Sequence, residues 1–160
     1  MSMVEIHNSV AKVYEENKET LEIFECLDEF SDTQNFCDHY GFNIEDSCNA
    51  ILIKAKKPEE FYAMFCVLGA NRLDVNHKAK EAMGAKRVSF ASREEAEAVT
   101  GQIYGGISPL GLPENIKVYM DKNVTDREKL FIGAGNRVSK FFLSPETLID
   151  LSSATVLDLT

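Results

Sequence analysis

Two short apolar runs constrain the fold of this chain more than any other feature. They are AILIKA at residues 50–55 and FYAMFCVL at residues 61–68, with Lys56, Lys57 and Pro58 between them. Both runs are too short for typical helices and are rich in β-branched or aromatic residues, which favours buried strands. The lysines at and near the turn, Lys54 included, are expected to be solvated charges, or alternatively contacts to a phosphate backbone.

The rest of the chain alternates short strands with short helices. Further strands are expected at 21–27, 86–90, 116–120, 129–132, 140–143 and 156–159. Capping and stop signals predict helices at 3–16 after Ser2, at 32–40 before Gly41, at 76–83 from Asn76, after the box Ser92–Glu95, and at 145–151. No regular βαβ alternation is present, so we predict an α+β fold. The expected architecture is one compact domain over 1–160, with a twisted mixed sheet of six to seven strands, open or partly closed, and short flanking helices.

Composition and charge exclude several classes of protein. Residues 1–50 hold two basic and twelve acidic residues, whereas residues 51–160 carry a net charge of +1. This distribution argues against DNA or broad duplex binding but not against reading a single-stranded RNA end. Neither a membrane span nor a signal peptide is visible, and a cytoplasmic location is the expectation. The cysteines, Cys26, Cys37, Cys48 and Cys66, have no metal-ligand spacing, so no metal or cofactor is predicted.

The segment GQIYGGISPLGLP, residues 101–113, contains four of the nine glycines and no ionisable side chain other than a tyrosine. It matches neither a phosphate-binding loop nor a dinucleotide fingerprint. One interpretation is a double turn, in which glycine supplies positive φ angles and the prolines direct the path. The other is a backbone-built pocket, in which peptide N–H groups bind a carbonyl or an oxyanion. The residue types alone favour neither the double turn nor the backbone-built pocket.

A family resemblance favours the pocket. The segment 82–113, AMGAKRVSFASREEAEAVTGQIYGGISPLGLP, is similar to the YbaK/EbsC family, whose members are free-standing relatives of the editing domain in prolyl-tRNA synthetases. Met120-Asp121, the break Gly133-Ala134-Gly135 and the run 142–148 follow in the family's order. The resemblance covers about residues 20–160 and leaves a helix within residues 1–17 outside it.

The resemblance implies an aminoacyl-tRNA deacylase that hydrolyses mischarged tRNA without metal or cofactor. Its expected partners are the acceptor end of a tRNA and, as an alternative or additional partner, an aminoacyl-tRNA synthetase. The expected catalytic residues are Gly105, Gly106 and Asn49. The expected substrate-binding residues are Ile107, Ser108, Pro109, Cys48 and Asn136.

One position departs from the family pattern. Where the family usually has a lysine at the start of a strand, this chain has Asn49, or Cys48 if the alignment shifts by one residue. Asparagine is shorter and neutral, so it cannot supply the same charge to a phosphate or an oxyanion. Lys140 and Asn136 are the candidates to replace it.

Three functions therefore stay open. The first is an editing hydrolase, with activity weakened or altered by Asn49. The second is a non-catalytic module that binds a tRNA 3′ end, a nucleotide-like ligand or a synthetase. The third is a structural or oligomerising protein in which the glycine segment is only a corner, with the oligomeric state left open by the sequence.

Overall fold

The structure is a computed structural model that describes residues 4–160. It contains eight strands in two sheets, together with five α-helices and four 3₁₀- or π-helical segments, within that range. The strands are β1 (Glu22–Glu25), β2 (Cys48–Lys57), β3 (Phe61–Leu68), β4 (Arg87–Phe90), β5 (Lys117–Asp121), β6 (Leu130–Gly133), β7 (Ser139–Leu143) and β8 (Thr155–Leu157). The helices are α1 (Asn8–Glu16), α2 (Thr33–Tyr40), α3 (Lys80–Met83), α4 (Arg93–Thr100) and α5 (Pro145–Ser152). The 3₁₀-helical segments are η1 (Asp28–Phe30), η2 (Ile44–Asp46) and η4 (Lys122–Asp126), and the π-helical segment is η3 (Val75–Ala79).

The larger sheet has the strand order β4-β2-β3-β5-β8, and the smaller sheet has the order β1-β7-β6. Strands β2 and β3 form the predicted antiparallel pair, with Cys48 opposite Leu68 and Ala55 opposite Phe61. Strands β3, β5 and β8 run parallel, and the other pairs are antiparallel. The α+β class is thus confirmed, but the strands form two sheets instead of one, and neither sheet closes within residues 4–160.

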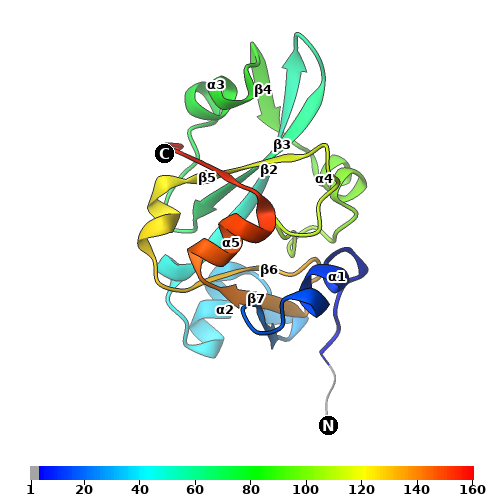
Figure 1. The fold of residues 1–160 in the computed structure, drawn as a ribbon, viewed down its shortest axis with the longest axis vertical. Coiled ribbons are helices and arrows are strands. Elements are labelled where there is room, and N and C mark those ends of the chain that lie inside the picture. Colours follow the sequence, from blue (N-terminus) through cyan, green and yellow to red (C-terminus); the bar gives the residue numbers. More distant parts are fainter. Residues whose placement is uncertain (1–3) are drawn as a thin grey trace.

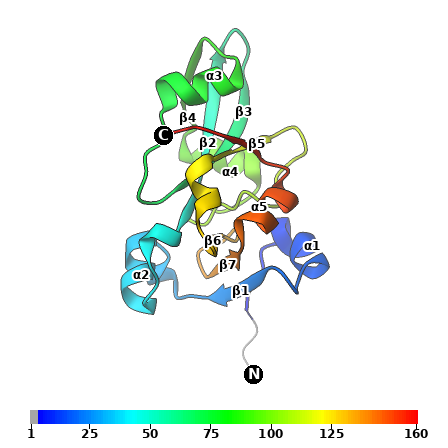
Figure 2. The same cartoon turned by 60° about the vertical axis from the view of Figure 1, so that its left-hand side comes forward.

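Within residues 4–160, the two sheets are linked through the backbone at one position. A single parallel bridge joins Ser47, just before β2, to Phe131 in β6. In Figure 1 the larger sheet fills the upper half of the molecule and the smaller sheet the lower half, with α5 across the middle. Figure 2 shows α1 and α2 on opposite sides of the smaller sheet.

Three apolar clusters hold these layers together. The largest lies between the sheets and includes Val10 of α1 and Phe141 of β7. A second lies beneath η3 and α3, against Phe65 of β3. The third is aromatic and packs Phe36 of α2 against Phe142 of β7. Phe141 and Phe142 serve different clusters because successive strand residues point to opposite faces of a sheet.

Local signals place most element boundaries correctly. Gly41 ends α2 in a left-handed conformation with φ of 78°. Ser92 and Glu95 form the predicted reciprocal capping box of α4. Ser144 caps α5, and Pro145 occupies its first turn. Each signal depends only on residues within one helical turn, so the tertiary environment does not override it.

Two helix starts differ from the prediction. The N-terminal helix begins at Asn8, not at residue 3, because His7 is its N-cap. Glu5 instead lies in a segment without regular secondary structure, where its carbonyl accepts a hydrogen bond from the Asn136 side chain. The predicted Ser2 cap lies outside the described residues. In the other helix the N-cap is Asp74, two residues before Asn76, and the first turn is a π-helix.

Candidate functional site

A pocket of about 430 Å³ opens where the two sheets meet. Its walls come from the junction between η1 and α2, the start of β2, the glycine segment, and strands β6 and β7. The lining residues are 31–33, 47–51, 104–107, 131–133, Arg137 and Lys140. Four regions that are distant in sequence therefore converge on one cavity, since residues 131–140 form a single hairpin region.

The glycines of the pocket wall permit a close approach between two backbones. A Cβ atom at Gly106 would overlap the carbonyl oxygen of Asn136, and a Cβ at Gly133 would overlap the carbonyl oxygens of Ile107 and Gly106. The Gly135 N–H donates to the Gly106 carbonyl at 2.7 Å. Glycine is needed here because the segment 104–107 packs directly against the turn that follows β6.

The peptide N–H groups of this wall are not equally available. The Gly106 N–H donates to the Ile103 carbonyl at 3.0 Å, so it is already used within the loop. The N–H groups of Gly105 and Ile107 have no partner among the hydrogen bonds of residues 4–160. These two amides, rather than that of Gly106, can bind a ligand oxygen.

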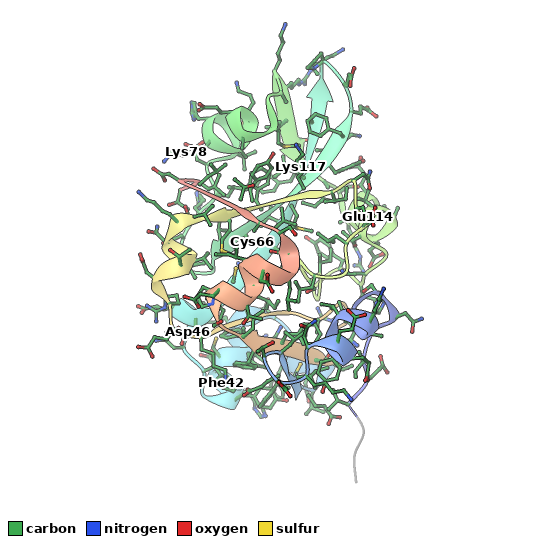
Figure 3. All side chains as sticks on the ribbon, in the orientation of Figure 1. Phe42, Asp46, Cys66, Lys78, Glu114 and Lys117 are labelled. Atoms are coloured by element: carbon green, nitrogen blue, oxygen red, sulfur yellow. The ribbon has the colours of Figure 1, made fainter. Side chains whose placement is uncertain are left out.

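Two of the predicted site residues line the pocket from β2. Asn49 is half-buried, and the Ser47 hydroxyl donates a long hydrogen bond of 3.5 Å to its side-chain oxygen. Cys48 is buried beside Cys66, and a hydrogen bond with Cys66, together with burial, raises the pKa of its thiol well above the ordinary value. Figure 3 places Cys66 near the centre of the molecule. A thiol held neutral in this way is a poor nucleophile.

Three other predicted residues do not line this pocket. Ser108 is fully buried, and its side-chain oxygen accepts a hydrogen bond from the Leu110 N–H at 3.1 Å. Pro109 lines a different cavity, on the side of α5 and β5. Asn136 is buried, and its side-chain oxygen accepts from the Val138 N–H at 3.0 Å and from the Ser139 hydroxyl at 2.8 Å. These residues shape the loops behind the pocket.

Gln102 has a structural role in the glycine segment that was not predicted from the sequence. The side chain of Gln102 is buried and bridges the loop, because its oxygen accepts from the Ser108 N–H and its nitrogen donates to the Leu110 carbonyl at 2.9 Å. A polar side chain in an otherwise apolar stretch was the available signal, since turns and loops need donors and acceptors for their buried backbone groups.

Two basic side chains reach the pocket. Lys140 of β7 is only 6% exposed, and its ammonium donates to the Ser31 carbonyl at 2.9 Å. Burial lowers the pKa of this ammonium. Arg137 lies against Gly105 and forms an ion pair with Asp28 at 3.0 Å. Of the two proposed replacements for a lysine at position 49, Lys140 therefore reaches the pocket and Asn136 does not.

Lys54 lies elsewhere and has a structural partner. Its ammonium contacts the Glu95 carboxylate at 2.7 Å, and the Tyr62 hydroxyl donates to the same carboxylate at 2.9 Å. The prediction of a solvated charge at this position is wrong, because the cluster ties β2 and β3 to the start of α4. The hydrogen bond from Lys54, followed by those from the Ser92 N–H and the Tyr62 hydroxyl, holds the pKa of Glu95 at about 2.

Residues 4–160 contain neither a cluster of metal-binding side chains nor a membrane-spanning helix. No group of three His, Cys, Asp or Glu side chains is placed to hold a metal ion there. In the same part of the chain, every helix is too short or too polar to span a bilayer.

Comparison with known proteins gives a family and a fold. The family described as the aminoacyl-tRNA editing domain matches residues 28–151. EbsC of Enterococcus faecalis, assigned as a Cys-tRNA(Pro)/Cys-tRNA(Cys) deacylase, is 30% identical over 92 residues, which are 58% of this chain and 56% of EbsC. The proline–tRNA ligase of Nautilia profundicola is 35% identical over 108 residues, which cover 59% of this chain and 18% of the ligase. The matches thus span about half of EbsC and a small part of the ligase.

Solved structures share the same architecture. A protein assigned as a trans-editing enzyme for prolyl tRNA synthetase superposes with a TM-score of 0.82 and 23% identity, over 98% of this chain and 99% of that chain. A hypothetical protein superposes with a TM-score of 0.84 and 22% identity, over 95% and 99% of the two chains. At these identities the likeness concerns the fold.

Proposed function

This chain belongs to the aminoacyl-tRNA editing domain family, and from that premise we propose that it hydrolyses the ester bond of mischarged aminoacyl-tRNA. The observation that carries the proposal is the pocket at the junction of the two sheets. Its lining includes Gly105 and Ile107, whose amides have no partner within residues 4–160, and Asn49 of β2. Peptide amides and a side-chain carboxamide can donate hydrogen bonds to the carbonyl oxygen of an ester and so polarise it for attack.

The proposed reaction uses water as the nucleophile. Water attacks the acyl carbon, and the bond from that carbon to the ribose oxygen breaks. The ribose oxygen receives a proton from the attacking water, so the products are a free amino acid and an intact tRNA. The N–H groups of Gly105 and Ile107 would stabilise the negative charge that develops on the carbonyl oxygen.

We propose a positioning role for Asn49 in this reaction. Its side chain offers both an N–H donor and an oxygen acceptor, so it can orient either the ester or the attacking water. Cys48 next to it is not a competing nucleophile, because its thiol stays protonated at neutral pH. The basic side chains that line the pocket are Lys140 and Arg137, of which Arg137 is paired with Asp28, and position 49 adds none.

The test is a deacylation assay on a panel of mischarged tRNAs, including alanyl- and cysteinyl-tRNA with the proline anticodon. We expect turnover by the wild type and a loss of about 100-fold in Asn49→Ala, by analogy with the removal of an oxyanion-stabilising donor. Asn71→Ala is a matched control, since Asn71 is exposed in the turn after β3. The proposal fails if neither the wild type nor Asn49→Lys hydrolyses any member of the panel.

A second candidate function is a binding module for a tRNA 3′ end. The neutral Asn49 and the internally bonded Gly106 amide favour it, because both reduce the stabilisation available to a transition state. This alternative predicts binding of an aminoacyl-adenosine analogue without hydrolysis. A synthetase partner would be detected by co-purification with prolyl-tRNA synthetase and loss of the complex without tRNA.

A further inference from the structure

We propose that Ser31, Thr33 and Lys140 form a subsite for an oxyanion, a carboxylate or a phosphate, within the pocket. The three residues line one wall, where the junction of η1 and α2 meets strand β7. The proposal deepens the proposed function and rests on it only for the source of the oxyanion.

The first observation is that Lys140 is a buried ammonium without a carboxylate. It takes part in no ion pair within residues 4–160, although 94% of its surface is covered. Buried lysines are nearly always paired with an opposite charge. An ammonium has three donors, and here one is used by the Ser31 carbonyl. The ammonium also lies over the Phe36 ring, 5.0 Å from its centroid, and Lys140 lines a cavity that a ligand can enter.

The second observation is independent of the first. The Ser31 hydroxyl oxygen is buried and has no hydrogen-bond partner among residues 4–160, while Ser31 lines the same pocket. Buried hydroxyl groups nearly always have a partner, a water included, so an unpartnered one on a pocket-lining residue is available to a ligand that settles against this wall. The Lys140 ammonium is 2.9 Å from the Ser31 carbonyl, so the two residues that we assign to the subsite are direct neighbours in the pocket wall.

The start of α2 adds to the same positive field. Asp32 caps the helix through the Gln34 N–H at 3.1 Å, and the Thr33 N–H has no partner among the hydrogen bonds of residues 4–160. The first turn of a helix carries partial positive charge and binds anions. A hydroxyl, an amide and an ammonium from two separate elements thus converge on one wall.

The neighbouring negative groups do not neutralise this wall. Asp32 also lines the pocket and lies within range of the Lys140 charge, but it is exposed to solvent and its side chain accepts a hydrogen bond from the Gln34 N–H. Burial raises the pKa of the Cys26 and Cys37 thiols, the other acidic groups near Lys140, so both stay neutral at pH 7. The wall therefore favours an anion over the ammonium group of an amino acid.

Two parts of an aminoacyl-tRNA could supply the oxyanion. One is the carboxylate side chain of an acidic amino acid, and the other is a phosphate of the RNA backbone. In the first case Lys140 would determine which amino acid is accepted. In the second case it would anchor every substrate equally.

The first experiment tests the subsite without any assumption about the reaction. Inorganic phosphate is titrated into ¹⁵N-labelled protein, and the amide signals of Thr33 and of the glycine segment are followed. We expect saturable shifts in the wild type, weakened at least about tenfold in Lys140→Met and measurably in Ser31→Ala. Lys12→Met, on the exposed face of α1, is the matched control and should titrate like the wild type.

Ser31→Ala keeps the test decisive if Lys140→Met fails to fold, since it removes only one hydroxyl. Absence of saturable shifts in the folded wild type, or equal affinity in the wild type and Ser31→Ala, overturns the proposal.

The second experiment identifies the source of the oxyanion. Four 3′-aminoacylamino-3′-deoxyadenosines are compared, carrying aspartyl or asparaginyl groups and either a 5′-hydroxyl or a 5′-phosphate. Tighter binding of both aspartyl compounds, lost in Lys140→Met, assigns the subsite to the amino-acid carboxylate. Tighter binding of both phosphorylated compounds, lost in the same variant, assigns it to the RNA.

The two proposals fail in different ways. If phosphate binds but none of the four analogues does, the subsite stands and the deacylase proposal is contradicted. If all four analogues bind with affinities that are equal and insensitive to Lys140→Met, the pocket accepts aminoacyl-adenosine and the oxyanion subsite is refuted.

Discussion

Replacement of Gly106 by alanine tests whether the pocket wall depends on the close approach of two backbones. The added Cβ would overlap the Asn136 carbonyl oxygen, which belongs to rigid backbone and cannot rotate away. Overpacking of this kind costs about 1–3 kcal/mol. If the loop moves outward, the hydrogen bond from the Gly135 N–H to the Gly106 carbonyl is lost, at a further cost of about 0.5–1.5 kcal/mol.

Together these effects lower the free energy of unfolding by about 2–4 kcal/mol. In a chain of this size each kcal/mol shifts the melting temperature by about 2–4 °C, so we expect Tm to fall by about 4–16 °C. The measurement is thermal denaturation followed by circular dichroism. Deacylation should fall as well, because the displaced loop carries the amides of Gly105 and Ile107.

Gly84→Ala is the matched control. Gly84 has a φ of +64°, but a Cβ there would meet nothing within 4 Å. Its substitution therefore adds only left-handed backbone strain, about 1–2 kcal/mol, far from the pocket. A Gly106→Ala variant no less stable than Gly84→Ala, with unchanged turnover, would refute the close-approach argument.

Three further predictions concern other parts of the structure. Because the folded-state pKa of Glu95 is about 2, below its ordinary 4.5, the contribution of this carboxylate to stability is present above pH 4.5 and disappears as the pH falls toward 2. The stability difference between wild type and Glu95→Gln, measured by urea denaturation, should follow that course, and a difference independent of pH would contradict it. Asp121→Ala leaves the Leu159 and Asn123 amides without their acceptor, so we expect the free energy of unfolding to fall by about 2–4 kcal/mol and hydrogen exchange at Leu159 to become faster. Unchanged exchange at Leu159 would contradict this role of the Asp121 carboxylate. All four cysteines are buried, so an aromatic disulfide reagent should modify them only at the rate of unfolding, and rapid modification of the native protein would show that a thiol is accessible.

Local sequence signals predicted the helices and strands because their physics is local. Gly41, the Ser92–Glu95 box and the Ser144-Pro145 pair each satisfy backbone groups within a few residues. The start of the N-terminal helix was predicted too early, because His7 caps the helix and the Glu5 carbonyl is held by a distant side chain, that of Asn136. The division into two sheets was equally out of reach, because apolar alternation does not say which strand pairs with which.

The candidate site was predictable on one side only. The family resemblance located Asn49 and the glycine segment, and both line the pocket. It could not show that the Gly106 amide is used by Ile103, or that Asn136 turns away to brace a loop. Those facts depend on the path of the backbone in three dimensions. Lys140 lies in a strand whose five residues are all buried, which is unusual for a lysine. Its contact with Ser31 became visible only in the three-dimensional structure.

The sequence by itself determined the elements, the α+β class and the family, because each of these depends on residue types and their order. Only the tertiary structure decided where the charge of the pocket lies. Position 49 is neutral, while the buried ammonium of Lys140 reaches the same cavity from β7 and contacts Ser31, 109 positions away in the chain. Such a contact arises from the packing of α2 against the smaller sheet, and no pattern of neighbouring residues encodes it.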